Sequence, residues 1–134
     1  MNTKLAQAMG LTAALLAASA YAQNIKVAQV VELSGVGTAA GTMYRNGAKL
    51  AINEINAAGG VMGKKIEAIE MDTQSQPAIA KAMTVKAIDE KVTAIFGPVF
   101  SGSILVSQTE SQKAAIPNFT GGEAANVTAQ GNPY

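Results

Sequence analysis

Val92-Thr93-Ala94-Ile95-Phe96-Gly97-Pro98-Val99-Phe100-Ser101-Gly102-Ser103 is the stretch of sequence that indicates the fold class most clearly. Residues 92–96 are mostly apolar and end at Gly97-Pro98, which predicts a short strand buried on both faces. After Ser101 the chain again has the composition of a helix. The first N–H groups of a helix lack internal partners, and the helix dipole adds positive potential there. We therefore expect this turn to bind an anion such as a ligand carboxylate.

The rest of the chain alternates predicted strands with predicted helices. Strands are predicted where apolar runs lie between turn signals, at residues 25–33, 66–72, 92–96 and 117–120. Helices are predicted from Thr42 to the Gly59-Gly60 pair, from Pro77 onward, and over about 102–115. The segment 123–134 receives no assignment.

Two of these helices have an apolar stripe that we expect to face the sheet, because side chains three and four positions apart share one face. In the first helix the stripe consists of Tyr44, Ala48, Ala51, Ile52 and Ile55. In the second helix it consists of Ala78, Ala82, Val85 and Ile88.

Strands alternating with helices predict an α/β fold with a doubly wound parallel sheet. The apolar strand 25–33 is expected at the centre and the strand 66–72, where acidic residues alternate, nearer an edge. With strand order 2-1-3-4, the switch point lies between the first and third strands, and ligands bind outside the carboxyl ends of strands at such a point. The loops at this edge are 34–41, 98–103 and 120–123.

Composition narrows the functional classes. The chain has 134 residues, of which 49% are hydrophobic and 14% charged, and this suits one compact domain. It has no histidine or cysteine, which excludes thiol chemistry, the usual zinc sites and a Ser-His nucleophile. The chain has ten basic and nine acidic residues, so it lacks the excess of positive charge that is typical of proteins that bind nucleic acid. We expect no cofactor and no metal.

Residues 1–22 have the pattern of a cleaved secretory signal. Lys4 precedes an apolar run, and Ala20-Tyr21-Ala22 supplies a small-x-small cleavage site before Gln23. The apolar run is shorter than the roughly 20 residues that span a bilayer. We therefore expect a soluble periplasmic product, 23–134, without membrane insertion after cleavage.

A glycine pattern leaves an enzyme open as an alternative. Gly35, Gly37 and Gly41 follow a strand and resemble a dinucleotide-binding fingerprint, with Asp72 in the place of the ribose-binding acid. Asp72 lies 31 positions past Gly41 (72 minus 41), beyond the usual interval of about 20 residues. A nucleotide-dependent enzyme on this scaffold is therefore the weaker hypothesis. Serine near the start of a helix can also be a plain helix cap.

From Ile25 onward, several segments resemble the N-terminal part of a periplasmic substrate-binding protein of the branched-chain amino acid type, which serves an ABC importer. These segments are IKVAQVVELSG, AINEINAAGGVMGKKIE, MDTQSQP, TAIFGPVFSGS and AAIPNFTGGEAANVT. The resemblance implies one lobe of a type I, Venus flytrap clamp, an amino-acid-like ligand, a membrane permease as partner, and no catalysis. Members of the family are far longer, so the second lobe is absent from this chain. A sensory receptor ectodomain with the same clamp is a further alternative.

The resemblance also implies roles for individual residues. Ser101 falls on the family's carboxylate-binding serine, and Gly122 falls near a position whose carbonyl takes the ligand ammonium. Ala124 replaces a family threonine, so Thr120 or the backbone of Glu123 is expected to substitute. An aromatic residue that often covers the ligand side chain is replaced by Ala40. The candidate ligand-binding residues are Ser34, Ser101, Gly102, Ser103, Thr120, Gly122 and Glu123.

Overall fold

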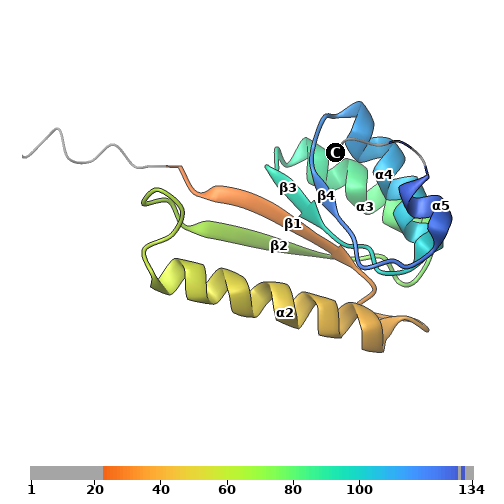
Figure 1. Ribbon diagram of the computed structural model, residues 1–134, viewed down its shortest axis with the longest axis horizontal. Helices are drawn as coiled ribbons and strands as arrows, with labels where there is room; N and C mark the ends of the chain where they lie inside the picture. The colour runs from red at the N-terminus through yellow and green to blue at the C-terminus, as the bar shows by residue number, and fades with distance from the viewer. Residues whose placement is uncertain (1–22, 130, 132–134) are drawn as a thin grey trace, which may run out of the picture.

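The computed structural model describes residues 23–129 and 131; the predicted signal segment, 1–22, lies outside the described residues (Figure 1). The strands are β1 (Ile25–Val31), β2 (Ile66–Asp72), β3 (Ala94–Phe96) and β4 (Asn118–Phe119). The helices are α2 (Thr38–Ala57), α3 (Pro77–Asp89), α4 (Ser101–Lys113) and α5 (Ala125–Thr128). Among these, no helix is both long and apolar enough to cross a bilayer.

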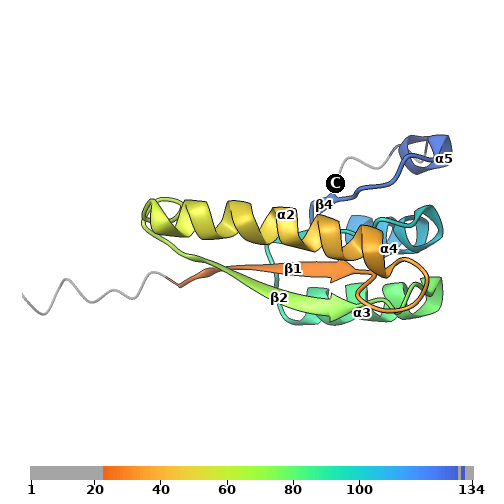
Figure 2. The same ribbon diagram turned by 90° about the horizontal axis from the view of Figure 1, so that it is seen from below.

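The sheet has the predicted parallel topology, with order β2-β1-β3-β4. Ile25 stands opposite Ile66 and Val31 opposite Asp72, so β1 and β2 end together. Helix α2 covers one face, and α3 packs on the other face with α4 beside it (Figures 1 and 2). All the strands therefore present their carboxyl ends to one edge of the sheet.

The core lies between the sheet and α3. Its buried residues are Ala28, Val30, Met71, Ala87, Val92 and Ile95. The last five residues of β1 are all buried, as expected for a central parallel strand that is covered on both faces. Strand β3 departs from the prediction, since Ile95 is buried but Ala94 and Phe96 are only half-buried.

Several predicted boundaries are corrected by the structure. Helix α2 begins at Thr38 rather than Thr42, because Gly41 lets its first turn pack directly on the end of β1. A Cβ at Gly41 would lie 2.2 Å from the Glu32 carbonyl oxygen. Helix α4 begins at Ser101, and its N-cap is Phe100, which makes no side-chain cap. Ser101 therefore does not cap the helix. The short α5 lies in the segment left unassigned.

The predicted buried face of α3 is correct only at Ile88, which is half-buried against the core. Ala78, Ala82 and Val85 are exposed, and the buried residues are Ala80, Thr84 and Ala87. Helix α3 packs on both the sheet and α4, and small side chains allow this close approach. Thr84 Oγ1 lies 2.9 Å from both the Ala80 carbonyl oxygen and Ser107 Oγ, which satisfies a buried hydroxyl between the two helices.

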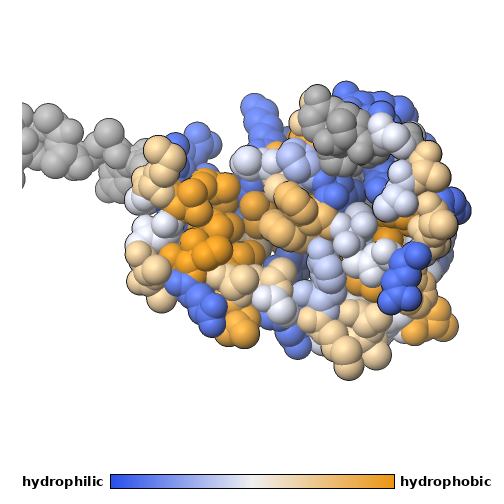
Figure 3. Space-filling view, viewed as in Figure 1, coloured by the Kyte–Doolittle hydropathy of each residue, from blue (hydrophilic) through white to orange (hydrophobic). Residues whose placement is uncertain are grey.

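Helix α2 buries less of its apolar stripe than predicted. Ile52 is buried, but Ala51 and Ile55 are exposed, because α2 covers only part of its face of the sheet. Apolar surface gathers at the end of the molecule where β1 and β2 begin (Figure 3). Val61 and Met62, in the turn between α2 and β2, are exposed.

Candidate functional site

A hollow of about 460 Å³ lies at the carboxyl edge of the sheet, between the start of α4 and the turn after β4. Its lining consists of Val99, Phe100, Ser101, Gly102, Gly121, Gly122 and Glu123. We call it the rim hollow. The two segments that form it follow β3 and β4, which are neighbours in the sheet, so the parallel topology brings them together.

Close backbone approach explains why glycine stands in both segments. Gly97 ends β3 at φ +97°, and a Cβ there would lie 2.3 Å from the Val30 carbonyl oxygen. A Cβ at Gly122 would lie 2.2 Å from Ile104 Cδ1. The Gly121 N–H donates to the Pro98 carbonyl oxygen at 3.2 Å and ties the two segments together.

The start of α4 offers unused hydrogen-bond donors. The Ile104 N–H donates to the Phe100 carbonyl oxygen at 2.9 Å, which closes the first helical turn. Within the described part of the chain, no acceptor takes the N–H groups of Ser101, Gly102 and Ser103. Ser101 is half-buried and lines the rim hollow. These donors, the hydroxyl and the positive end of the helix dipole suit an anionic group.

The structure brings four of the seven candidate residues together in the rim hollow, namely Ser101, Gly102, Gly122 and Glu123. The other three candidates do not line it. Ser103 is 1% exposed, and its hydroxyl has no partner among the described residues. Thr120 is half-buried in the turn after β4. Ser34 lies on the neighbouring loop, where its hydroxyl donates to Asp72 at 2.6 Å.

Asp72 shapes this neighbouring loop. Its carboxylate accepts the N–H groups of Leu33 (2.9 Å), Ser34 (3.1 Å) and Gln74 (2.8 Å), as well as the Ser34 hydroxyl. Burial raises the pKa of Asp72, but these hydrogen bonds outweigh it and hold the pKa below its usual value. The residue compared above with a ribose-binding acid is therefore engaged in loop structure.

Two residues that were not among the seven ligand-binding candidates also hold the rim. Glu32, which is 0% exposed, accepts the N–H groups of Val99 and Phe100. Tyr44 on α2 donates its hydroxyl to the Phe119 carbonyl oxygen at 2.6 Å, and burial raises the pKa of this hydroxyl. The available signal for Glu32 was an acidic residue near the end of a predicted strand that is mostly apolar. Tyr44 was predicted as a core residue only.

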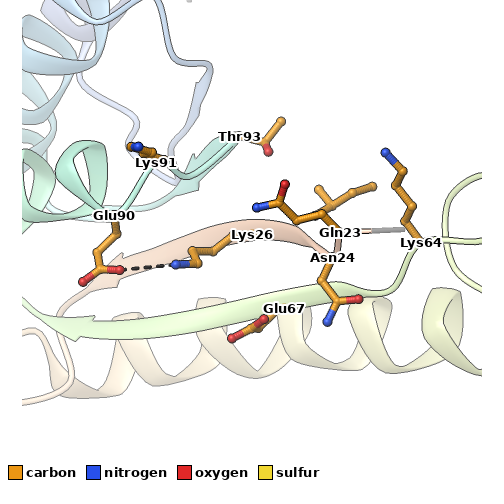
Figure 4. Close-up of a pocket in the computed structure, with 9 residues that line it drawn as sticks. Gln23, Asn24, Lys26, Lys64, Glu67, Glu90, Lys91 and Thr93 are labelled. Atoms are coloured by element: carbon orange, nitrogen blue, oxygen red, sulfur yellow. Dashed lines mark hydrogen bonds and ion pairs between the residues drawn. The ribbon is translucent and has the colours of Figure 1, made fainter. Parts of the chain in front are cut away.

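A larger hollow of about 620 Å³ lies at the opposite, amino-terminal edge of the sheet (Figure 4). Lys26 and Glu90 form an ion pair across it at 3.3 Å, with Lys64 and Lys91 nearby. It lies next to the carboxyl end of α3, where the helix dipole disfavours anions. The rim hollow fits the topological rule for ligand sites better. Among the described residues, no group of three or more acidic side chains could hold a metal ion.

The parallel sheet, its strand order and the position of the rim hollow define a lobe of the type I periplasmic binding protein class. The chain belongs to the periplasmic binding protein family, whose sequence profile matches residues 24–134. The family resemblance deduced from the sequence and the predicted α/β fold are thus both confirmed.

Similar proteins come from several bacteria. The Leu/Ile/Val-binding protein homolog 7 of Brucella suis is 35% identical over 132 residues, covering 91% of this chain and 33% of that protein. The leucine-specific-binding protein of Salmonella typhimurium is 36% identical over 94 residues, covering 70% of this chain and 26% of that protein. The chain therefore spans only about a quarter to a third of their length.

A solved structure has the same fold. The branched-chain amino acid transporter substrate binding protein LivJ from Streptococcus pneumoniae, in complex with isoleucine, superposes with a TM-score of 0.80 at 36% identity. The match covers 83% of this chain and 32% of that one.

Proposed function

We propose that the chain is the N-terminal ligand-binding lobe of a periplasmic solute-binding protein that supplies a branched-chain or related amino acid to an ABC importer. The observation that carries this proposal is the pair of unused N–H groups of Ser101 and Gly102, two residues that line the rim hollow beside the Ser101 hydroxyl. The names of the relatives, which are leucine- or Leu/Ile/Val-binding proteins, support the class of ligand.

The carboxylate of the ligand binds the Ser101 hydroxyl and the N–H groups of Gly102 and Ser103. Hydrogen bonds to an ionised group are stronger than neutral ones. Ser103 contributes through its backbone alone, since its side chain is buried. The ammonium binds the Gly122 carbonyl oxygen or the Glu123 carboxylate, which is exposed beside the hollow.

The lining charge favours a zwitterion over a simple anion. Among the described residues that line the hollow, Glu123 is the one charged residue, and none is a lysine or arginine. Val99 and Phe100 add apolar surface that suits an aliphatic side chain. A related structure from Rhodopseudomonas palustris, 26% identical with a TM-score of 0.72, holds 3,4-dihydroxybenzoic acid. That ligand shares the carboxylate but lacks an ammonium, so it serves as a comparison in the test below.

In the complete protein, a second lobe closes on this edge and excludes water, which strengthens the charged hydrogen bonds. A membrane permease then receives the ligand. Export depends on the signal segment, so the mature protein recovered from the periplasm should begin at Gln23. One lobe alone makes only part of the contacts, and we expect it to bind weakly.

The test is an NMR titration of the ¹⁵N-labelled chain with L-isoleucine, 3,4-dihydroxybenzoate and 2-methylbutylamine, the analogue without a carboxylate. Isoleucine should shift the amide signals of Ser101 and Gly102. Ser101→Ala should weaken its binding by about 1–3 kcal/mol, as expected for a hydrogen bond to a charged group. Thr109→Ala, an exposed change on the same helix, is the control.

No amide shift in the rim hollow with any amino acid would overturn the proposal. A titration with NAD and NADP tests the alternative of a nucleotide-dependent enzyme, which requires shifts in the 34–41 loop instead.

A further inference from the structure

Glu32 is a fully buried carboxylate at the end of the central strand. Its Oε2 accepts the Val99 N–H at 3.0 Å, and its Oε1 accepts the Phe100 N–H at 3.2 Å. Within the described residues it forms no ion pair with a lysine or arginine. Burying a carboxylate without a cation is costly, and here two backbone donors offset the cost.

The stem of Glu32 is held in place from the side of α2. A Cβ at Gly37 would lie 3.1 Å from both Glu32 Cβ and Glu32 Cγ, and 2.8 Å from the Phe100 ring. Gly41 packs on the Glu32 backbone. The carboxylate therefore has little conformational freedom. It fixes the backbone of Val99 and Phe100, which are 67 and 68 residues further along the chain, relative to the end of β1.

The two amides that Glu32 binds come immediately before the unused donors of α4. Phe100 is the N-cap residue and makes no side-chain cap, so an acceptor from another strand fixes the entry into the helix. Because the Val99 and Phe100 N–H groups are occupied, the first N–H groups that this segment can offer to an incoming carboxylate are those from Ser101 onward. Glu32 thus sets both the orientation of Ser101 and the boundary of the anion site.

We propose that Glu32 is a positioning residue of the binding site, which fixes the 99–100 backbone so that Ser101 and the first free N–H groups of α4 face the ligand. This inference rests on the proposed function. A glutamine cannot replace the carboxylate, because its NH₂ group would face one of the two backbone donors.

The test compares Glu32→Gln with Glu67→Gln, a matched change at an exposed acidic residue of β2. Amide hydrogen exchange and L-isoleucine affinity are both measured by NMR on the whole chain. In Glu32→Gln, exchange at Val99 and Phe100 should accelerate at least about tenfold, and the isoleucine dissociation constant should rise about tenfold or more, as expected when bonds to a charged group are lost. Glu67→Gln should change neither.

A purely structural role would give a different result. Glu32→Gln would then lower the urea midpoint but leave the isoleucine dissociation constant of the folded protein unchanged, and this would overturn the inference. If Glu32→Gln does not fold, the wild-type chain decides: exchange at Val99 and Phe100 as fast as at the exposed Gly102, whose N–H has no acceptor among the described residues, would refute the two bonds.

Failure of the proposed function gives a separate result. If the wild-type chain binds no amino acid, the proposed function is wrong. The position of Ser101 can still be compared between wild type and Glu32→Gln through the chemical shift of its amide signal. An unshifted Ser101 signal in Glu32→Gln would refute the positioning role by itself.

Discussion

Asp72→Ala should destabilise the chain more than any other exchange of a carboxylate that is not fully buried. The side chain accepts hydrogen bonds from three backbone N–H groups and one hydroxyl, at 2.6–3.1 Å. A hydrogen bond to a charged group contributes about 1.5–3 kcal/mol when buried. Asp72 is half-buried, so solvent screens these bonds, and we expect a total loss of about 2 kcal/mol in the free energy of unfolding.

The pH dependence tests the cause. Because the pKa of Asp72 is lower in the folded chain than in the unfolded chain, its contribution is fully present above the unfolded pKa, about 4, and is lost as the pH falls through the folded pKa. The difference in stability between wild type and Asp72→Ala should therefore be constant near pH 7 and shrink toward pH 2.

Urea unfolding followed by far-UV circular dichroism measures both quantities. Glu67→Ala, at an exposed position on the same strand, is the control and should change the stability by no more than about 0.5 kcal/mol. Equal effects of the two variants, or a difference that does not depend on pH, would refute the reasoning.

Two further predictions concern packing and are measured by the same urea unfolding. Gly41→Ala should destabilise the chain by about 1–3 kcal/mol, because its Cβ would lie 2.2 Å from the Glu32 carbonyl oxygen. Gly47→Ala, in open space on the same helix, should instead stabilise it by up to about 1 kcal/mol, and a loss there would contradict this. Thr84→Val should cost about 1–3 kcal/mol, since it leaves the buried Ser107 hydroxyl without this partner. The exposed Thr109→Val is its control, and similar losses in both variants would show that the contact between α3 and α4 contributes little.

Local sequence pattern carries most of the information on topology. The run 25–33 is mostly apolar, with polar residues only at Lys26, Gln29 and Glu32, and this composition is typical of a strand covered on both faces, which predicted its central place. The alternation of acidic residues in 66–72 predicted an edge strand, and β2 is one. Alternating strands and helices then leave few possible topologies, because crossover connections are right-handed.

The same pattern was insufficient for helix α3. Its apolar residues Ala78, Ala82 and Val85 share a face, but that face is exposed. Periodicity identifies a stripe by polarity, whereas packing against two partners selects small side chains such as Ala80 and Ala87 irrespective of polarity. The buried Thr84 shows the same effect, since its hydroxyl is satisfied by contacts that only the folded chain provides.

The sequence by itself determined the fold class and the loops that follow the strands, because these follow from short-range pattern and the handedness of crossovers, whereas the strand order 2-1-3-4 was an assumption that the structure bears out. Only the tertiary structure decided how that edge is built. Glu32 and Asp72 each bind the loop of the adjacent strand, at separations of 67 and 39 residues. A hydrogen bond between residues so far apart leaves no periodic trace in the sequence, since it depends on the register and direction of strands that pair only in the folded chain.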